Sequence, residues 1–106
     1  MANIDISSKF SNEKPTIKLS EDLILSINDG HKNVLIVNTL MNNNKLSEAD
    51  RMSKILDQLL GTNATEKIDK LNLRFLDYQK IFFGVMAAIN DESYEDVESR
   101  FRNTKK

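Results

Sequence analysis

Few side chains in this chain have the types and the spacing that catalysis requires. His31 is the only histidine among the 106 residues, and there is no cysteine. A Ser-His-Asp arrangement would have to be built around His31, and nothing in the sequence points to its nucleophile or its orienting acid. A thiolate metal site and a histidine cluster are both excluded. We interpret His31 as a solvated or helix-end histidine.

Carboxylates are densest near the C-terminal end, where an ion site would be sought. The segment holds five acidic residues: Asp91, Glu92, Glu95, Asp96 and Glu98. They lack the D-x-[DN]-x-[DN]-G spacing and the distal glutamate of a calcium loop, so helix capping and a solvated face explain them. The glycines are isolated and form no phosphate-cradling loop. We therefore predict no catalytic residue, no metal site and no cofactor, and we expect that the chain is not an enzyme.

The charge of the chain argues against a polyanionic partner. The formal net charge is −1, with 15 basic and 16 acidic residues spread along the sequence. Binding to nucleic acid depends on clustered Lys and Arg, so we expect no nucleic-acid partner. Two consecutive helices expected at 48–60 and 64–71 could be taken for a helix-turn-helix, but Glu66 and Asp69 would oppose phosphates. A DNA-binding regulator stays the weaker alternative.

Apolar runs are too short for a membrane span. The longest, Val34 to Val37 and Val85 to Ile89, fall far below the roughly 20 residues that cross a bilayer. The N-terminus MANIDISSKF has no apolar core of a signal peptide. We expect a soluble protein with no membrane partner, which stays where it is made.

The elements that would position any site form one domain of the α+β class, mainly α, with a short N-terminal β-hairpin packed on a bundle of about five helices. Residues 1–15 are interpreted as a flexible lead-in, 16–102 as the hairpin-plus-helical domain and 103–106 as a frayed C-terminus. Alternating apolar residues predict the hairpin, with its turn at residues 20–22. They are Ile17, Leu19, Leu23, Leu25 and Ile27.

Residues 33–41 can be interpreted as a strand or as a helix. Asp29-Gly30 followed by a β-branched run favours a strand. The apolar spacing through Leu40 and Met41 favours a helix from about His31, with Asp29 available to cap its first turn. We prefer the helix, because the pattern continues without strand alternation.

Cap signatures mark the next two helices. Ser47 opens a helix with a regular apolar stripe, and Gly61 ends it. Asn63 is expected to cap a short second helix that Asn72 ends.

The central helix is predicted from about Phe75 to Asn90. One apolar stripe is expected in the core: Phe75, Tyr78, Phe82, Val85, Met86 and Ile89. Other residues lie off this stripe, where either flanking helices cover them or they bind another protein. These candidate binding residues are Leu76, Phe83, Gly84, Ala87 and Ala88. Gly84 and Ala88 would leave a notch for a closely packed helix. A last helix would place Tyr94, Val97 and Phe101 on one side.

A resemblance extends over Ile17 to Phe101. The segments VLIVNTLM, LSEADRMSKILDQLLG, ATEKIDKLNL and FLDYQKIFFGVMAAI, followed by a short acidic helix, are similar to the small tail assembly chaperones of long-tailed bacteriophages of Gram-positive bacteria. The likeness lies in helix lengths and apolar placement. It implies a non-enzymatic chaperone in the host cytoplasm that binds the tape measure protein and helps recruit tail tube subunits. We also expect a homo-oligomer, because a long helical client needs repeated apolar contact, which many copies lined along it would supply.

A small regulatory or adaptor protein that binds another protein is the main alternative. Neighbouring genes for a tail tube protein and a long tape measure protein would favour the chaperone.

Overall fold

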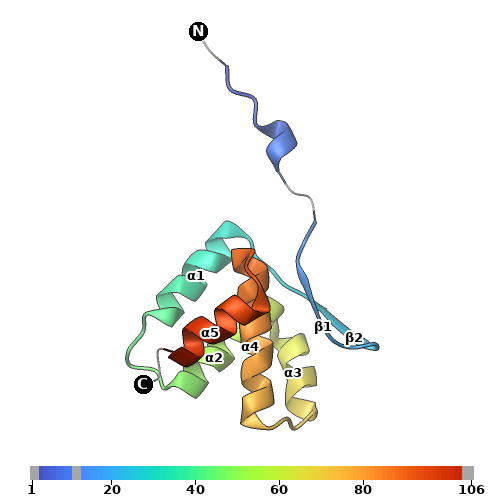
Figure 1. Ribbon diagram of the computed structural model, residues 1–106, viewed down its shortest axis with the longest axis vertical. Coiled ribbons are helices and arrows are strands. Elements are labelled where there is room, and N and C mark those ends of the chain that lie inside the picture. Colours follow the sequence, from blue (N-terminus) through green and yellow to red (C-terminus); the bar gives the residue numbers. More distant parts are fainter. Residues whose placement is uncertain (1–2, 11–12, 104–106) are drawn as a thin grey trace.

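A β-hairpin followed by five helices makes up the described part of the chain, residues 3–10 and 13–103 of a computed structural model (Figure 1). The elements are β1 (Thr16–Ser20), β2 (Leu23–Ser26), α1 (His31–Met41), α2 (Glu48–Leu60), α3 (Thr62–Lys70), α4 (Phe75–Asn90) and α5 (Tyr94–Asn103). A single 3-10 turn, Ser7–Lys9, precedes β1. The predicted class, α+β and mainly α, is confirmed.

The hairpin pairs β1 with β2 in antiparallel fashion, and its alternation is the one predicted. Ile17 lies opposite Leu25, and the register shifts between Lys18 and Ser20 before the turn. Leu25 is buried, whereas Ile24, which points the other way, is 57% exposed. Beyond β2, the Ile27 N–H donates to the Pro15 carbonyl at 2.9 Å, which extends the pairing past the strand ends.

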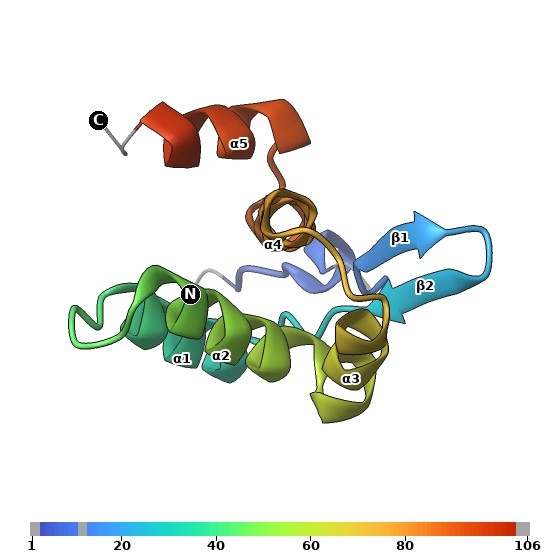
Figure 2. The ribbon, with the colours of Figure 1, turned by 90° about the horizontal axis from the view of Figure 1, so that it is seen from below.

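The helices form three layers with α4 in the middle. Figure 2 shows α4 end-on, with α5 on one side and the layer of α1, α2 and α3 on the other. α4 packs against α5, α2 and β1. Cover on both sides explains why this helix is apolar around most of its circumference.

Residues 31–41 are helical, which confirms the helix preferred over a third strand. The prediction that Asp29 caps α1 is wrong. The N-cap is Gly30, and no side chain caps this helix. Nearby, the Gly30 N–H donates to Asn28 Oδ1, and the Asn33 side chain donates to the backbone carbonyls of Asn28 and Gln58 at 2.7 and 2.9 Å. The start of α1 is thus tied to α2 through Asn33.

The caps of α2 are as predicted, and the start of α3 is not. Ser47 Oγ accepts a hydrogen bond from the Asp50 N–H at 3.1 Å, and Gly61 adopts φ of 90° at the C-cap. Gly61 is at the same time the N-cap of α3, so that helix begins at Thr62 and the predicted Asn63 cap is wrong. Asn72, with φ of 48°, lies in the left-handed region after α3.

The bounds of α4 are those predicted. Its C-cap is Asp91, whose φ of 53° is left-handed and whose N–H donates to the Ala87 carbonyl. α5 extends to Asn103, one residue beyond the predicted domain boundary. Residues 104–106, predicted to fray, lie outside the described residues, as do 1–2 and 11–12 of the predicted lead-in. Among the described helices, none is both long and apolar enough to cross a bilayer.

Candidate protein-binding surfaces

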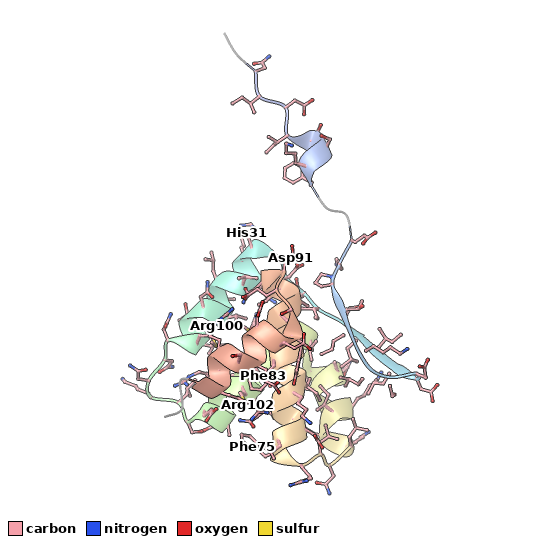
Figure 3. The ribbon with its side chains drawn as sticks, in the orientation of Figure 1. His31, Phe75, Phe83, Asp91, Arg100 and Arg102 are labelled. Atoms are coloured by element: carbon pink, nitrogen blue, oxygen red, sulfur yellow. The ribbon has the colours of Figure 1, made fainter. Side chains whose placement is uncertain are left out.

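Phe83 and Ala87, two of the residues predicted for binding, lie inside the molecule. They are 1% and 6% exposed. The Phe83 ring stacks on Phe101 with centroids 5.6 Å apart, and the Arg102 guanidinium lies 5.5 Å from its centroid (Figure 3). We expected this face of α4 either to be covered by a flanking helix or to bind another protein. At Phe83 it is covered by α5, and Ala87 is buried as well.

Gly84 and Ala88 face the N-terminal part of the chain. A Cβ added at Gly84 would lie 2.9 Å from Ile17 Cδ1, so the notch predicted for a second helix is filled by β1 instead. Ala88 is partly buried and lines a pocket with Pro15 and Asp29. The hairpin therefore takes the place that the sequence interpretation gave to another helix.

Leu76 belongs to a separate exposed surface at the turn between α3 and α4, which we call the corner. Its four large apolar side chains are Leu71, Leu73, Phe75 and Leu76, exposed by 48, 38, 48 and 49%. The prediction that Phe75 is a core residue is wrong. Figure 3 shows Phe75 at the end of α4 that α5 does not cover.

A pocket opens at the corner. It has a volume of about 270 Å³ and is lined by Ile68, Asp69, Asn72, Leu73, Phe75 and Tyr78. The left-handed turn at Asn72 redirects the chain from α3 into α4, and Leu73 and Phe75 line the pocket on either side of Arg74. The corner thus combines exposed apolar surface with a concave place for a side chain.

A second concave surface, the groove, lies among α1, α4 and α5. It has a volume of about 370 Å³ and is lined by Asn38, Met41, Asn42, Met86, Ile89, Asn90, Arg100 and Phe101. Leu35, 60% exposed, lies on α1 three residues before Asn38, that is, one helical turn before a lining residue and on the same side of the helix. Two methionines give the groove an adaptable apolar lining.

Two of the five acidic residues near the C-terminal end form ion pairs with arginines of α5. Glu92 pairs with Arg100, and Glu98 pairs with Arg102 at 3.4 Å. Tyr94 Oη donates to Glu98 at 3.2 Å. Burial is the largest cause that raises the pKa of Tyr94, and this hydrogen bond is the second. Within residues 3–10 and 13–103, no group of three His, Cys, Asp or Glu side chains is placed to hold a metal ion. His31 is exposed at the first residue of α1.

A third exposed apolar surface was missed by the sequence interpretation. It is the segment of residues 3–10, which we call the arm, and its Ile4, Ile6 and Phe10 are 87, 49 and 66% exposed. Figure 1 shows the arm projecting from the end of the molecule opposite to the corner. The signal for this surface was present in the sequence, because three large apolar residues in a polar lead-in are more than a passive tail needs.

Comparison with protein families, with curated proteins and with solved structures finds no match to this chain.

Proposed function

We propose that this chain is a non-enzymatic assembly chaperone that binds an apolar, helical segment of a client protein in the groove. The observation that carries the proposal is the open groove lined by Met41, Met86, Ile89 and Phe101, with exposed Leu35 one helical turn before the lining residue Asn38. An amphipathic helix that docks in such a groove buries its apolar stripe against it, and methionines adapt to different side chains along a long client. The polar lining supports the same use of the groove.

Amide side chains of Asn38, Asn42 and Asn90 border the groove together with the Arg100 guanidinium. Amides both donate and accept hydrogen bonds, so they tolerate many polar neighbours on the client. A surface of this composition suits repeated binding to related segments better than recognition of one fixed shape.

We take the identity of the client from the resemblance to tail assembly chaperones. On this proposal the client is the tape measure protein of a long-tailed phage, the chaperone acts in the host cytoplasm, and it helps recruit tail tube subunits. Apolar contact with a long helical client, repeated along its length, keeps that client from aggregating before the tube encloses it.

The test is retention of purified tape measure segments by immobilised chaperone variants. Leu35→Ser removes an exposed apolar side chain one turn from the groove residue Asn38, and we expect it to weaken binding by roughly tenfold, as the loss of about 1.5 kcal/mol from one buried Leu predicts. Ile24→Ser is the matched control, because Ile24 is 57% exposed but lies on the hairpin.

The control variant should retain the segments as well as the unaltered chain does. Equal retention by Leu35→Ser would place the client elsewhere, and no retention by the unaltered chain would reject the proposed client.

A further inference from the structure

The arm exposes apolar side chains that the rest of the described chain does not cover. Ile4, Ile6 and Phe10 are all exposed, and none of them packs against the core. Exposed apolar side chains that gather in one short segment mark a contact with another molecule more often than single ones do. A surface that accepts them should be apolar, concave and of opposite charge.

The corner has the first two of these properties. Leu73 and Phe75 line a pocket of about 270 Å³ together with Asp69 and Asn72, and their sequence neighbours Leu71 and Leu76 are exposed. A pocket of this size has room for an apolar side chain from a protein partner.

The arm and the corner each carry charges of both signs, Asp5 and Lys9 in the arm and Arg74 and Asp69 in the corner, so opposite charges can face each other. In the arm, Asp5 lies between Ile4 and Ile6, and in the corner, Arg74 lies between Leu73 and Phe75. Within the described part of the chain, Arg74 takes part in no ion pair. One carboxylate between apolar residues thus matches one guanidinium between apolar residues, a pairing that favours a fixed register.

The Asp5 carboxylate is prepared for such a contact. Both hydrogen bonds from Ser7, from its N–H at 2.9 Å and its hydroxyl at 2.7 Å, go to Asp5 Oδ1. They hold the pKa of Asp5 below its usual range, so the group is charged at neutral pH. Oδ2 remains available to accept from a guanidinium.

The arm is attached at the wrong end of α4 to reach the corner of its own chain. Residues 13–15 line a pocket with Ala88 and Asp91 at the C-terminal end of α4, whereas the corner lies at the N-terminal end. A helix of 16 residues is about 24 Å long. The three residue steps from Glu13 to Phe10 span at most about 10 Å. Phe10 therefore cannot reach the corner of its own chain, so the arm cannot place all three apolar side chains there at once.

We propose that the arm of one copy docks on the corner of a second copy, with Asp5 of the arm paired to Arg74 of the corner. The two surfaces differ and lie at opposite ends of the molecule, so the contact is heterologous, and each copy offers a free arm and a free corner to further copies. This contact leaves the groove open and does not require the client.

Sedimentation velocity over a range of concentrations tests the proposal. The sedimentation coefficient of the unaltered chain should rise with concentration. An arm variant, Ile6→Ser with Phe10→Ser, and a corner variant, Leu73→Ser with Phe75→Ser, should each stay monomeric where the unaltered chain associates. An equimolar mixture of the two variants should form a heterodimer and stop there, because only one intact arm and one intact corner remain.

Charge reversal separates the proposed contact from a general loss of apolar surface. Asp5→Arg and Arg74→Asp alone should each raise the dissociation constant by about tenfold, and the chain with both changes should recover most of the loss. Ile24→Ser should associate as the unaltered chain does.

Three results would overturn the proposal. They are an unaltered chain that is monomeric at every concentration, an arm variant that associates normally, and a variant mixture that stays monomeric. The arm variant alters no core residue, and circular dichroism checks that the corner variant keeps its helices. None of these measurements involves the client, so they are independent of the test of the groove.

Discussion

Gly84 lets the hairpin lie directly on the central helix. The Cβ of any other residue would lie 2.9 Å from Ile17 Cδ1, which is closer than carbon atoms approach. The atom that must give way is the flexible end of a side chain, so a single methyl group can be accommodated and a larger side chain cannot.

We predict that Gly84→Ala changes the free energy of unfolding by less than about 1 kcal/mol, because the gain in helix propensity and the contact with Ile17 offset each other. In an Ile17→Ala background the contact is gone, and the same change should stabilise the fold by about 1 kcal/mol. Urea denaturation of the unaltered chain, of the two single variants and of the double variant measures the coupling energy between positions 17 and 84. Additive effects would show that Ile17 does not limit the space at Gly84.

Phe83 and Leu76 were predicted to share a binding surface, but their environments differ. Phe83 contacts the rings of Phe82, Tyr94 and Phe101, whereas Leu76 is half exposed at the corner. A sequence shows which residues are apolar around a helix, but not which neighbouring element covers each side.

Phe83→Ser should lower the free energy of unfolding by at least about 3 kcal/mol, since it removes a buried ring and leaves a cavity and a hydroxyl in its place. Leu76→Ser should lower it by less than about 1 kcal/mol. Thermal denaturation followed by circular dichroism compares the two. A small effect of Phe83→Ser would mean that α5 does not cover this side of α4.

Local signals at the level of elements predicted most of the helices. The apolar stripe of α2, the Ser47 cap and the Gly61 stop are all determined within a few residues, and so they could be found from the sequence. The errors arose where two signals compete. Gly61 ends one helix and begins the next, so the expected Asn63 cap had no role. Gly30, next to Asp29, took the N-cap position of α1.

Two serine caps should each contribute measurably to stability. Ser47 Oγ accepts from the Asp50 N–H, and Ser93 Oγ accepts from the Asp96 N–H, both at 3.1 Å. Ser47→Ala and Ser93→Ala should each cost about 1 kcal/mol. Asp29→Ala should change stability by less than about 0.5 kcal/mol, because no side chain caps α1.

Chemical denaturation of the three variants measures these differences. A loss with Asp29→Ala as large as that with Ser47→Ala would restore the capping role first predicted for Asp29.

At the scale of the whole molecule, more of the fold than of the binding surfaces could be predicted from the sequence. The hairpin and the helices could be predicted because apolar periodicity reports which face of each element is buried. The groove and the corner could not, because they depend on how far α5 and α1 extend over α4, and that is settled by packing between elements. The exposure of Phe75 illustrates this, since its spacing is that of a core residue.

Stability of the whole molecule should fall in alkaline solution. Burial, the largest cause, and the nearby charges of Asp69 and Asp57 raise the pKa of Tyr78 above its ordinary value of about 10. The folded state thus keeps a proton that the unfolded state releases. The resulting stability is complete below about pH 10 and is lost as the pH rises through the folded pKa.

The midpoint of urea unfolding, measured from pH 8 upwards, should fall more steeply above about pH 10 for the unaltered chain than for Tyr78→Phe. Parallel curves for the two proteins would show that the Tyr78 phenol has the same pKa in both states.

The arm and the corner lie at opposite ends of α4, and this placement has a consequence for any row of copies joined as proposed. Such a row has polarity, because one terminal copy presents an empty corner and the other presents an unused arm. The two ends can then grow at different rates, and a single protein that binds one of them can stop growth there without affecting the other.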